Sequence, residues 1–251
     1  MFNKHPKGLI AAALANLGER FGFYTMMAIL VLFLQAKFGM NGKEAGFIYS
    51  TFYFSIYILA LVGGIIADKT RNYKGTIFTG IVLMAVGYLL LAIPSKTPVD
   101  NKMLYLVITC ASLFVIAFGN GLFKGNLQAL VGQMYDNPQY ANMRDSGFSL
   151  FYMFINIGAI FAPFAAVGVR NWWLSTFGYN YDADLPALCH GQLAGTLSPE
   201  ATETYHTLVT KASTAPVQDY TAFASDYLNV FTTGFHYAFG VAIIAMAISL
   251  T

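Results

Sequence analysis

The stretch N-L-G-E-R-F-G-F-Y, residues 16–24, places two ionised side chains, Glu19 and Arg20, side by side within a long apolar segment. Hydrocarbon cannot solvate a charge, and even lenient scales assign ~2.5–3.5 kcal/mol to each charged residue near the centre of a membrane helix. If a helix covers residues 7–37, Glu19 lies only ~4.5 Å from its centre, which is too far for a carboxylate to reach the interface. The two charges therefore need a partner or a water-filled cavity.

The composition is that of an integral membrane protein. Of the 251 residues, 57% are hydrophobic and 10% are charged, whereas soluble domains carry roughly 25% charged residues. Six apolar blocks reach or approach the ~20 residues that an α-helix needs to cross the hydrocarbon. They cover residues 8–35, 46–67, 75–93, 103–131, 148–169 and 231–250. Barrel strands would be shorter and would alternate in polarity, so the sequence predicts an all-α bundle of six membrane helices.

Three regions follow from this distribution: residues 1–169 with five helices, a polar insertion over residues 170–230, and a sixth helix over residues 231–251. Ser198-Pro199-Glu200 has the cap, the proline and the first-turn acid of a helix start, which predicts a short helix to about Lys211. A second short helix is expected over residues 219–228. We expect the insertion to pack over the helix ends outside the cytoplasm, with a docking site for a partner or substrate as the alternative.

The loop after the second block indicates the orientation. It holds Asp68 and three cations, Lys69, Arg71 and Lys74, and short loops rich in Lys and Arg stay in the cytoplasm. We therefore expect both termini in the cytoplasm and a multi-pass protein in the lipid bilayer of the plasma membrane, which in a bacterium is the inner membrane. The net charge of +2 and the lack of a basic run do not indicate a nucleic-acid partner.

Lys124 is the third charge inside an apolar block. An unpaired ammonium and an unpaired carboxylate in one bundle are each better off facing the other, so we expect Glu19 to be its counter-charge, unless the long stem of Lys124 reaches the interface. The alternative explanation for Glu19 and Arg20 is a structural salt bridge between helices. Residues 119–121, G-N-G, are expected to permit close helix packing or to loosen the fourth helix near Lys124.

Enzymatic chemistry has no support in the sequence. No nucleophile and base occur at a usable spacing, and there is no glycine-rich phosphate loop and no metal cluster, so no enzyme activity, cofactor or metal is predicted. Cys110 is expected to be a buried small hydrophobe, and Cys189 has no second loop cysteine to pair with. An even number of spans is instead typical of half of a transporter built from two bundles, with the binding site at their seam.

Four motifs, in order, resemble those of the proton-coupled oligopeptide transporters of the major facilitator superfamily. The family's first-helix motif E-x-x-E-R-F-x-Y-Y stands here as Asn16-x-x-Glu19-Arg20-Phe21-x-Phe23-Tyr24. The loop signature is G-G-I-I-A-D at residues 63–68, continuing to Thr76-Ile77. The fourth-helix and fifth-helix signatures are G-L-F-K-G-N-L-Q-A-L-V-G at residues 121–132 and F-S-L-F-Y-M-F-I-N-I-G-A-I at residues 148–160. The resemblance covers nearly the whole chain apart from residues 170–230.

The resemblance implies a role for each matching residue. Arg20 and Lys124 would face the terminal carboxylate of a peptide, and Asn156 would hydrogen-bond the peptide backbone or its terminal amine. Tyr24 and Tyr57 would line the pocket, although tyrosines in apolar blocks are commonly packing residues, and Asn156 alone would suit a routine inter-helix hydrogen bond.

Other matching positions concern coupling and movement. Glu19 would balance Lys124 and is a candidate proton carrier. The loop motif with Gly64, Asp68 and Lys69 would take part in alternating access, in which two six-helix halves rock about a central cavity. The second half is absent from these residues.

The chain also departs from the family pattern. Asn16 replaces an acid and cannot carry a proton, and Phe23 replaces a tyrosine and removes a hydroxyl. Gly125 stands where a proline commonly follows the lysine, and Met27 where a cation often sits. The resemblance thus implies a secondary active transporter of di- and tripeptides, proton-driven with altered coupling. A transporter of another small carboxylate or zwitterion, and a non-transporting peptide receptor, are the alternatives.

Overall fold

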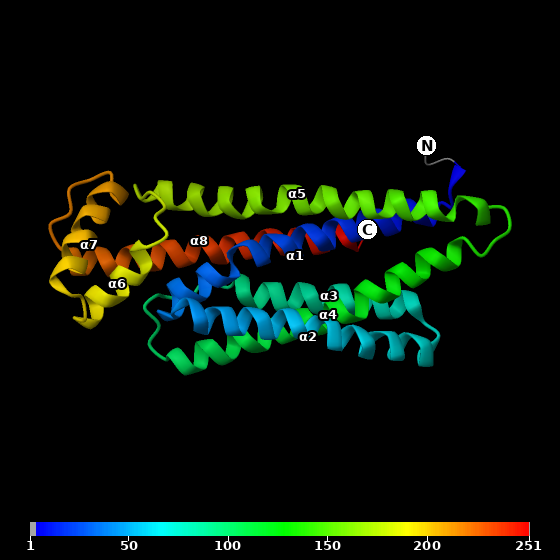
Figure 1. The fold of residues 1–251 in the computed structure, drawn as a ribbon, viewed down its shortest axis with the longest axis horizontal. Coiled ribbons are helices and arrows are strands. Elements are labelled where there is room, and N and C mark those ends of the chain that lie inside the picture. Colours follow the sequence, from blue (N-terminus) through cyan, green and yellow to red (C-terminus); the bar gives the residue numbers. More distant parts are fainter. Residues whose placement is uncertain (1–3, 251) are drawn as a thin grey trace.

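The computed structural model describes residues 4–250, and within them the chain forms a helical bundle (Figure 1). Six of its helices are long and apolar enough to cross a membrane, which confirms the predicted fold class. The elements are α1 Gly8–Phe38, α2 Gly42–Thr70, α3 Tyr73–Ala92, α4 Lys102–Met134, the 3-10 helix η2 Ala141–Met143, α5 Arg144–Thr176, α6 Leu185–Ala194, α7 Pro199–Ala212 and α8 Tyr220–Ser249.

Local sequence explains where several of the long helices begin and end. α1 stops at Gly39, whose φ of +60° lies in the left-handed region that glycine adopts without strain. Asn41 caps α2 in a reciprocal box with Glu44, because each side chain accepts from the backbone N–H of the other. Asn72 and Asn101 cap the starts of α3 and α4, and the side-chain oxygen of each accepts a hydrogen bond from a backbone N–H group.

The six long helices pack in two groups. Helix α1 lies against α5 and α8, and α4 lies against α2 and α3, while α3 also touches α8 (Figure 1). α1 is the most enclosed helix, with 61% of its most apolar window buried, compared with 22% for α2 and 28% for α5. α2 and α5 therefore leave wide apolar faces uncovered, which suit lipid or a further part of a membrane protein.

Glycines set the close approach of α4 to its neighbours. A methyl group on Gly119 would lie 2.6 Å from the carbonyl oxygen of Gly80 in α3, and one on Gly121 would lie 2.6 Å from the carbonyl carbon of Leu59 in α2. The backbone of α4 can approach α2 and α3 this closely only because these two positions have no Cβ. The helix is continuous through residues 119–121, so the expected loosening is wrong and the expected close packing is confirmed.

The polar segment between α5 and α8, residues 177–219, is called the cap here. It carries α6 and α7 and lies at one end of the bundle, away from the start of α1 (Figure 1). The helix predicted after Ser198 is present as α7, and Ser198 Oγ accepts from the N–H of Ala201. The predicted separate helix over residues 219–228 is wrong, because these residues are the first turns of α8, capped by Asp219.

Two side chains fix the cap to the bundle. The guanidinium of Arg170, at the end of α5, stacks 3.6 Å from the ring centroid of Tyr181. His190 in α6 donates from Nε2 to the carbonyl of Ala36 in α1, at 2.8 Å. Burial is the main reason that the pKa of His190 is lowered from its ordinary value, since a charged imidazolium loses hydration there.

Candidate functional site

The charges of residues 19 and 20 meet inside the bundle. Arg20 donates from Nε to Glu19 Oε2 and from Nη2 to Glu19 Oε1, the second at 2.9 Å. Only 6% of Arg20 and none of Glu19 is exposed, so neither charge reaches solvent. The guanidinium also lies 5.0 Å from the ring centroid of Phe23, one turn further along α1. Two adjacent residues thus form a forked, buried ion pair.

Asn120 joins this pair from α4, and the sequence alone did not single it out. Its Nδ2 donates to Glu19 Oε1 at 2.5 Å, whereas its Oδ1 is buried and has no hydrogen-bond partner within residues 4–250. Successive residues of a helix point ~100° apart, so α3 meets Gly119, α2 meets Gly121, and Asn120 is left facing α1. Tyr88 of α3 is also fully buried near this pair, and its hydroxyl has no partner.

Lys124 lies one turn after Asn120 on the same face of α4. Its Nζ is 5.3 Å from the ring centroid of Tyr57 in α2, and its charge acts on Glu19. Within residues 4–250 it forms no ion pair shorter than 4.0 Å. The structure therefore differs from the expected Glu19–Lys124 pair, because Arg20 and Asn120 occupy the carboxylate and Lys124 is partly exposed.

Aromatic side chains flank the ammonium. Tyr49, Tyr53 and Tyr57 form a stripe on α2 at four-residue spacing, and the Tyr57 hydroxyl donates to that of Tyr53 at 3.2 Å. Tyr57 is 51% exposed. Tyr24 is partly buried, with its ring 5.5 Å from that of Phe23. The tyrosines therefore offer hydroxyl groups along an open surface beside Lys124.

The remaining residues singled out by sequence are dispersed. Asn16 is 5% exposed and Phe23 is buried, its ring stacked 6.4 Å from that of Phe52. Asn156 is exposed on α5, where Gly158 is the position that packs on α1, with a methyl there 2.8 Å from the carbonyl oxygen of Leu17. Since residues two apart on a helix point in nearly opposite directions, the structure does not bring Asn156 together with Arg20.

The loop motif lies at the end of α2 away from the cap. Gly64 has open space beside it, and Asp68 and Lys69 are exposed. The hydroxyl of Tyr73 donates to Asp68 Oδ1 across the turn to α3. This part of the chain is therefore far along α2 from Tyr53, on the exposed end of the helix.

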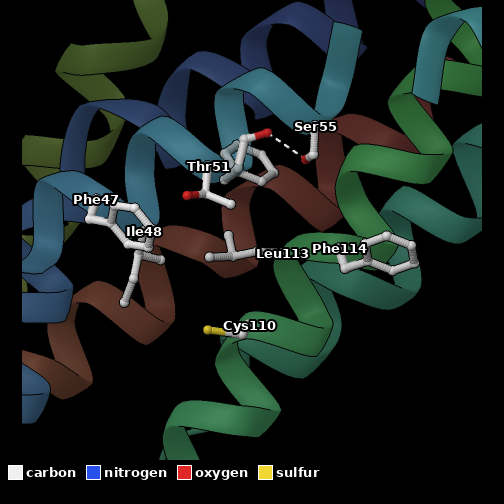
Figure 2. A pocket seen from close by; sticks show the side chains of 8 residues that line it. Phe47, Ile48, Thr51, Ser55, Cys110, Leu113 and Phe114 are labelled. Atoms are coloured by element: carbon white, nitrogen blue, oxygen red, sulfur yellow. Dashed lines mark hydrogen bonds between the residues drawn. The ribbon is translucent and has the colours of Figure 1, made fainter. Parts of the chain in front are cut away.

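A pocket of about 280 Å³ between α2 and α4 lies apart from these charges. Figure 2 shows Phe47, Ile48 and Thr51 from α2 opposite Cys110 and Phe114 from α4. Cys110 is exposed there, so the expectation that it is buried is wrong. The lining has no charged side chain to pair with a carboxylate or an amine, and we do not take this pocket as the candidate site.

Solved structures share this fold. A crystal structure of peptide transporter POT in complex with sulfate has a TM-score of 0.62 and 27% identity, covering 100% of this chain and 37% of that chain. A variant of peptide transporter POT in complex with alafosfalin has a TM-score of 0.63 and 26% identity, covering 100% of this chain and 38% of that chain.

Relatives in sequence are transporters. "Peptide transporter YePEPT" of Yersinia enterocolitica is 34% identical over 72% of this chain and 34% of its own length. "Dipeptide and tripeptide permease A" of Enterobacter sp. is 34% identical over 70% of this chain and 32% of its own length. The chain thus spans about a third of the length of the curated relatives that it matches.

A family model supplies the assignment. The model of the POT family matches residues 74–251, which include Asn120, Lys124 and Asn156 but begin after the first-helix motif. The relatives are transporters, which confirms the expectation that this is not an enzyme. The buried ion pair of α1 and the neighbouring Lys124 of α4 therefore lie in a multi-pass membrane protein, and the chain belongs to the POT family.

Proposed function

We propose that the chain is the N-terminal six-helix part of a secondary active transporter that takes up di- and tripeptides by alternating access. The observation that carries this proposal is the pair of cations on one side of the bundle, Arg20 in a buried fork and Lys124 free of any carboxylate within the described residues. The names of two relatives, a peptide transporter and a dipeptide and tripeptide permease, support peptides as the cargo.

In this proposal Lys124 receives the terminal carboxylate of the peptide. Its ammonium rests over the electron-rich face of Tyr57, and this contact is weaker than an ion pair and easily exchanged for one. Arg20 strengthens the same positive region, and Tyr24 and Tyr57 supply hydroxyl groups. Asn156 would serve the backbone or the amine of the peptide from α5, across the space that the partner half closes.

Proton coupling is proposed to run through Glu19, because Asn16 leaves no second acid in the first-helix motif. Asn120 can serve both states of this carboxyl group. Its Nδ2 donates to the ionised carboxylate, and a half turn of the amide would bring the unpaired Oδ1 to accept the proton of the neutral acid. Arg20, Lys124 and Tyr88 are the other titratable groups that act on Glu19.

The proposal also covers the orientation of the chain in the membrane and its contact with the other half of the transporter. The end with Lys69, Arg71 and Lys74 faces the cytoplasm, the cap lies outside, and the membrane is the bacterial inner membrane. The loop motif of Gly64, Asp68 and Lys69 meets the other half during rocking. The cap, residues 177–219, is an accessory cover rather than part of the transport path.

Transport and cargo are tested with the full-length protein in liposomes. Labelled dipeptide should accumulate inside against its gradient when a proton gradient is applied, and unlabelled di- and tripeptides should compete. Competition by single amino acids or organic acids alone would favour a transporter of another carboxylate or zwitterion. Peptide binding without net flux would favour a receptor and refute transport.

Coupling is tested separately with Glu19→Gln and Asn120→Leu. Glu19→Gln cannot take up a proton, so its uptake should lose pH dependence while equilibrium exchange of peptide persists. Asn120→Leu has a similar volume but no polar atoms, and its pH profile should shift because the charge-assisted hydrogen bond to the carboxylate is gone. An unchanged pH profile in Glu19→Gln would remove Glu19 as the proton site without affecting the peptide proposal.

A further inference from the structure

A second pocket, which contains charged and polar side chains, lies at the end of the bundle where α1 meets the cap. Its volume is about 260 Å³, and α1, α3, α4 and α8 line it together with the loop after α3. The aromatic and aliphatic walls include Phe33, Leu90 and Tyr105, and its polar groups include Lys37 and His236. It is separate from the charges around Glu19, none of which is among its lining residues.

Lys37 brings an uncompensated positive charge to this pocket. The side chain is only 2% exposed. Its ammonium donates to the carbonyls of Ser95 at 2.5 Å and Lys96 at 3.2 Å, and to Thr97 Oγ1 at 2.8 Å. No carboxylate lies within 4.0 Å of it among residues 4–250. Neutral oxygens therefore satisfy its hydrogens while its charge remains available to an anion nearby.

His236 brings an unpaired acceptor. Its Nδ1 lies 2.6 Å from the carbonyl oxygen of Leu91, and since a carbonyl only accepts, Nδ1 carries the ring hydrogen. Next to a buried cation the ring is neutral, because a second buried positive charge would be costly. Nε2 is then an acceptor, and among residues 4–250 it is buried without a hydrogen-bond partner, in a side chain that is 4% exposed. The pocket therefore offers this nitrogen to a ligand group that donates a hydrogen bond.

The rim of the pocket indicates where such a group would come from. Leu90, Ile93 and Ile108 line it and are 41%, 55% and 41% exposed. They lie at the end of α3 and the start of α4, two of the membrane-spanning helices. Large exposed aliphatic side chains on membrane-spanning helices suit contact with lipid chains, so we infer that the pocket opens toward the membrane near one interface.

We propose that this pocket binds the headgroup of an anionic phospholipid that carries free hydroxyl groups, as phosphatidylglycerol does. A glycerol hydroxyl donates to His236 Nε2, and the phosphate charge is balanced by Lys37 across the pocket. The acyl chains follow Leu90, Ile93 and Ile108 into the hydrocarbon. Phosphatidylethanolamine would place its ammonium near Lys37, and phosphatidylcholine has no hydrogen to donate. The inference is independent of the proposed transport activity.

The test measures the Tm of the full-length protein in detergent with each of the three phospholipids added. Phosphatidylglycerol should raise the Tm more than either of the others. His236→Asn keeps a donor for the Leu91 carbonyl but lacks an atom at the position of Nε2, so it should lose this preference. His236→Gln places its amide oxygen near the position of Nε2 and should keep it. Equal shifts with all three lipids, or an unchanged preference in His236→Asn, would overturn the proposal.

Two further variants keep the proposal testable if a substitution of His236 destabilises the protein. Trp173→Phe removes another buried polar atom without a partner, Nε1, which lies outside this pocket, and it should leave the lipid preference unchanged. Ile93→Trp alters only the exposed rim and should narrow the entrance, which lowers the response to phosphatidylglycerol. A full response in Ile93→Trp would show that the lipid binds elsewhere.

Discussion

The contact of Gly121 with α2 predicts a measurable loss of stability when a single methyl group is added. The new Cβ in Gly121→Ala would lie 2.6 Å from the carbonyl carbon and oxygen of Leu59, whereas an ordinary contact begins at 3.4 Å. Both atoms belong to backbone and cannot rotate away as a side chain would, so the backbones of α2 and α4 must separate locally by up to about 0.8 Å. Overpacking of this kind costs about 1–3 kcal/mol, and it would also carry Tyr57 away from Lys124.

Gly125 provides the matched control on the same helix, because within the described part of the chain no neighbouring helix comes within 4 Å of a Cβ placed there. Both substitutions gain the same helix propensity of ~1 kcal/mol, so the difference between them isolates the clash. At roughly 2–4 °C per kcal/mol, Gly121→Ala should melt several degrees below Gly125→Ala in a thermal unfolding assay of the full-length protein in detergent. Equal melting temperatures would refute the close contact of α2 with α4.

Two other predictions concern protons. Asn16→Glu adds a second acid one turn before Glu19, and two neighbouring negative charges disfavour ionisation of either carboxyl group. Uptake should therefore depend on protons up to a higher pH than in the unsubstituted protein. Identical pH profiles of the two proteins would contradict this. The pKa of His190 is lowered by its burial between the cap and α1. Below about pH 6.5 the unfolded chain therefore binds a proton that the folded chain resists, and stability should fall as the pH drops from 7 to 5. His190→Gln, which can still donate to Ala36, should flatten that decline in Tm, and an equally steep decline would remove His190 as its cause.

The spans were predictable because an apolar run of membrane length has few alternatives to a helix. The residues at which the helices begin and end were harder to predict. α8 begins at Tyr220, whereas the sequence predicts a separate short helix over residues 219–228 and a sixth membrane helix only from residue 231. A helix that leaves the hydrocarbon keeps its hydrogen bonds in any solvent, so polarity marks the edge of the membrane and not the end of the helix.

The charged residues of the site can be predicted from the free-energy cost of placing a charge in hydrocarbon, whereas its uncharged residues Asn120 and Tyr88 cannot. Glu19, Arg20 and Lys124 stand out because hydrocarbon cannot solvate them. Asn120 carries no charge and was read with its two glycines as a packing element, although its position one turn before Lys124 places it on the same face of α4. Tyr88 gave no signal, since a tyrosine in an apolar block is ordinary and its orientation toward Glu19 depends on how α3 packs.

The most direct test of the account is dipeptide uptake by Lys124→Ala compared with Lys102→Ala. Both lysines belong to α4, but Lys102 is exposed at its first residue while Lys124 lies beside Tyr57 in the bundle. If Lys124 receives the peptide carboxylate, the loss of a charge-assisted contact of ~1.5–3 kcal/mol should reduce uptake by Lys124→Ala to background, and Lys102→Ala should transport normally. Equal uptake by the two variants, with both present in the membrane at the same level, would contradict the account.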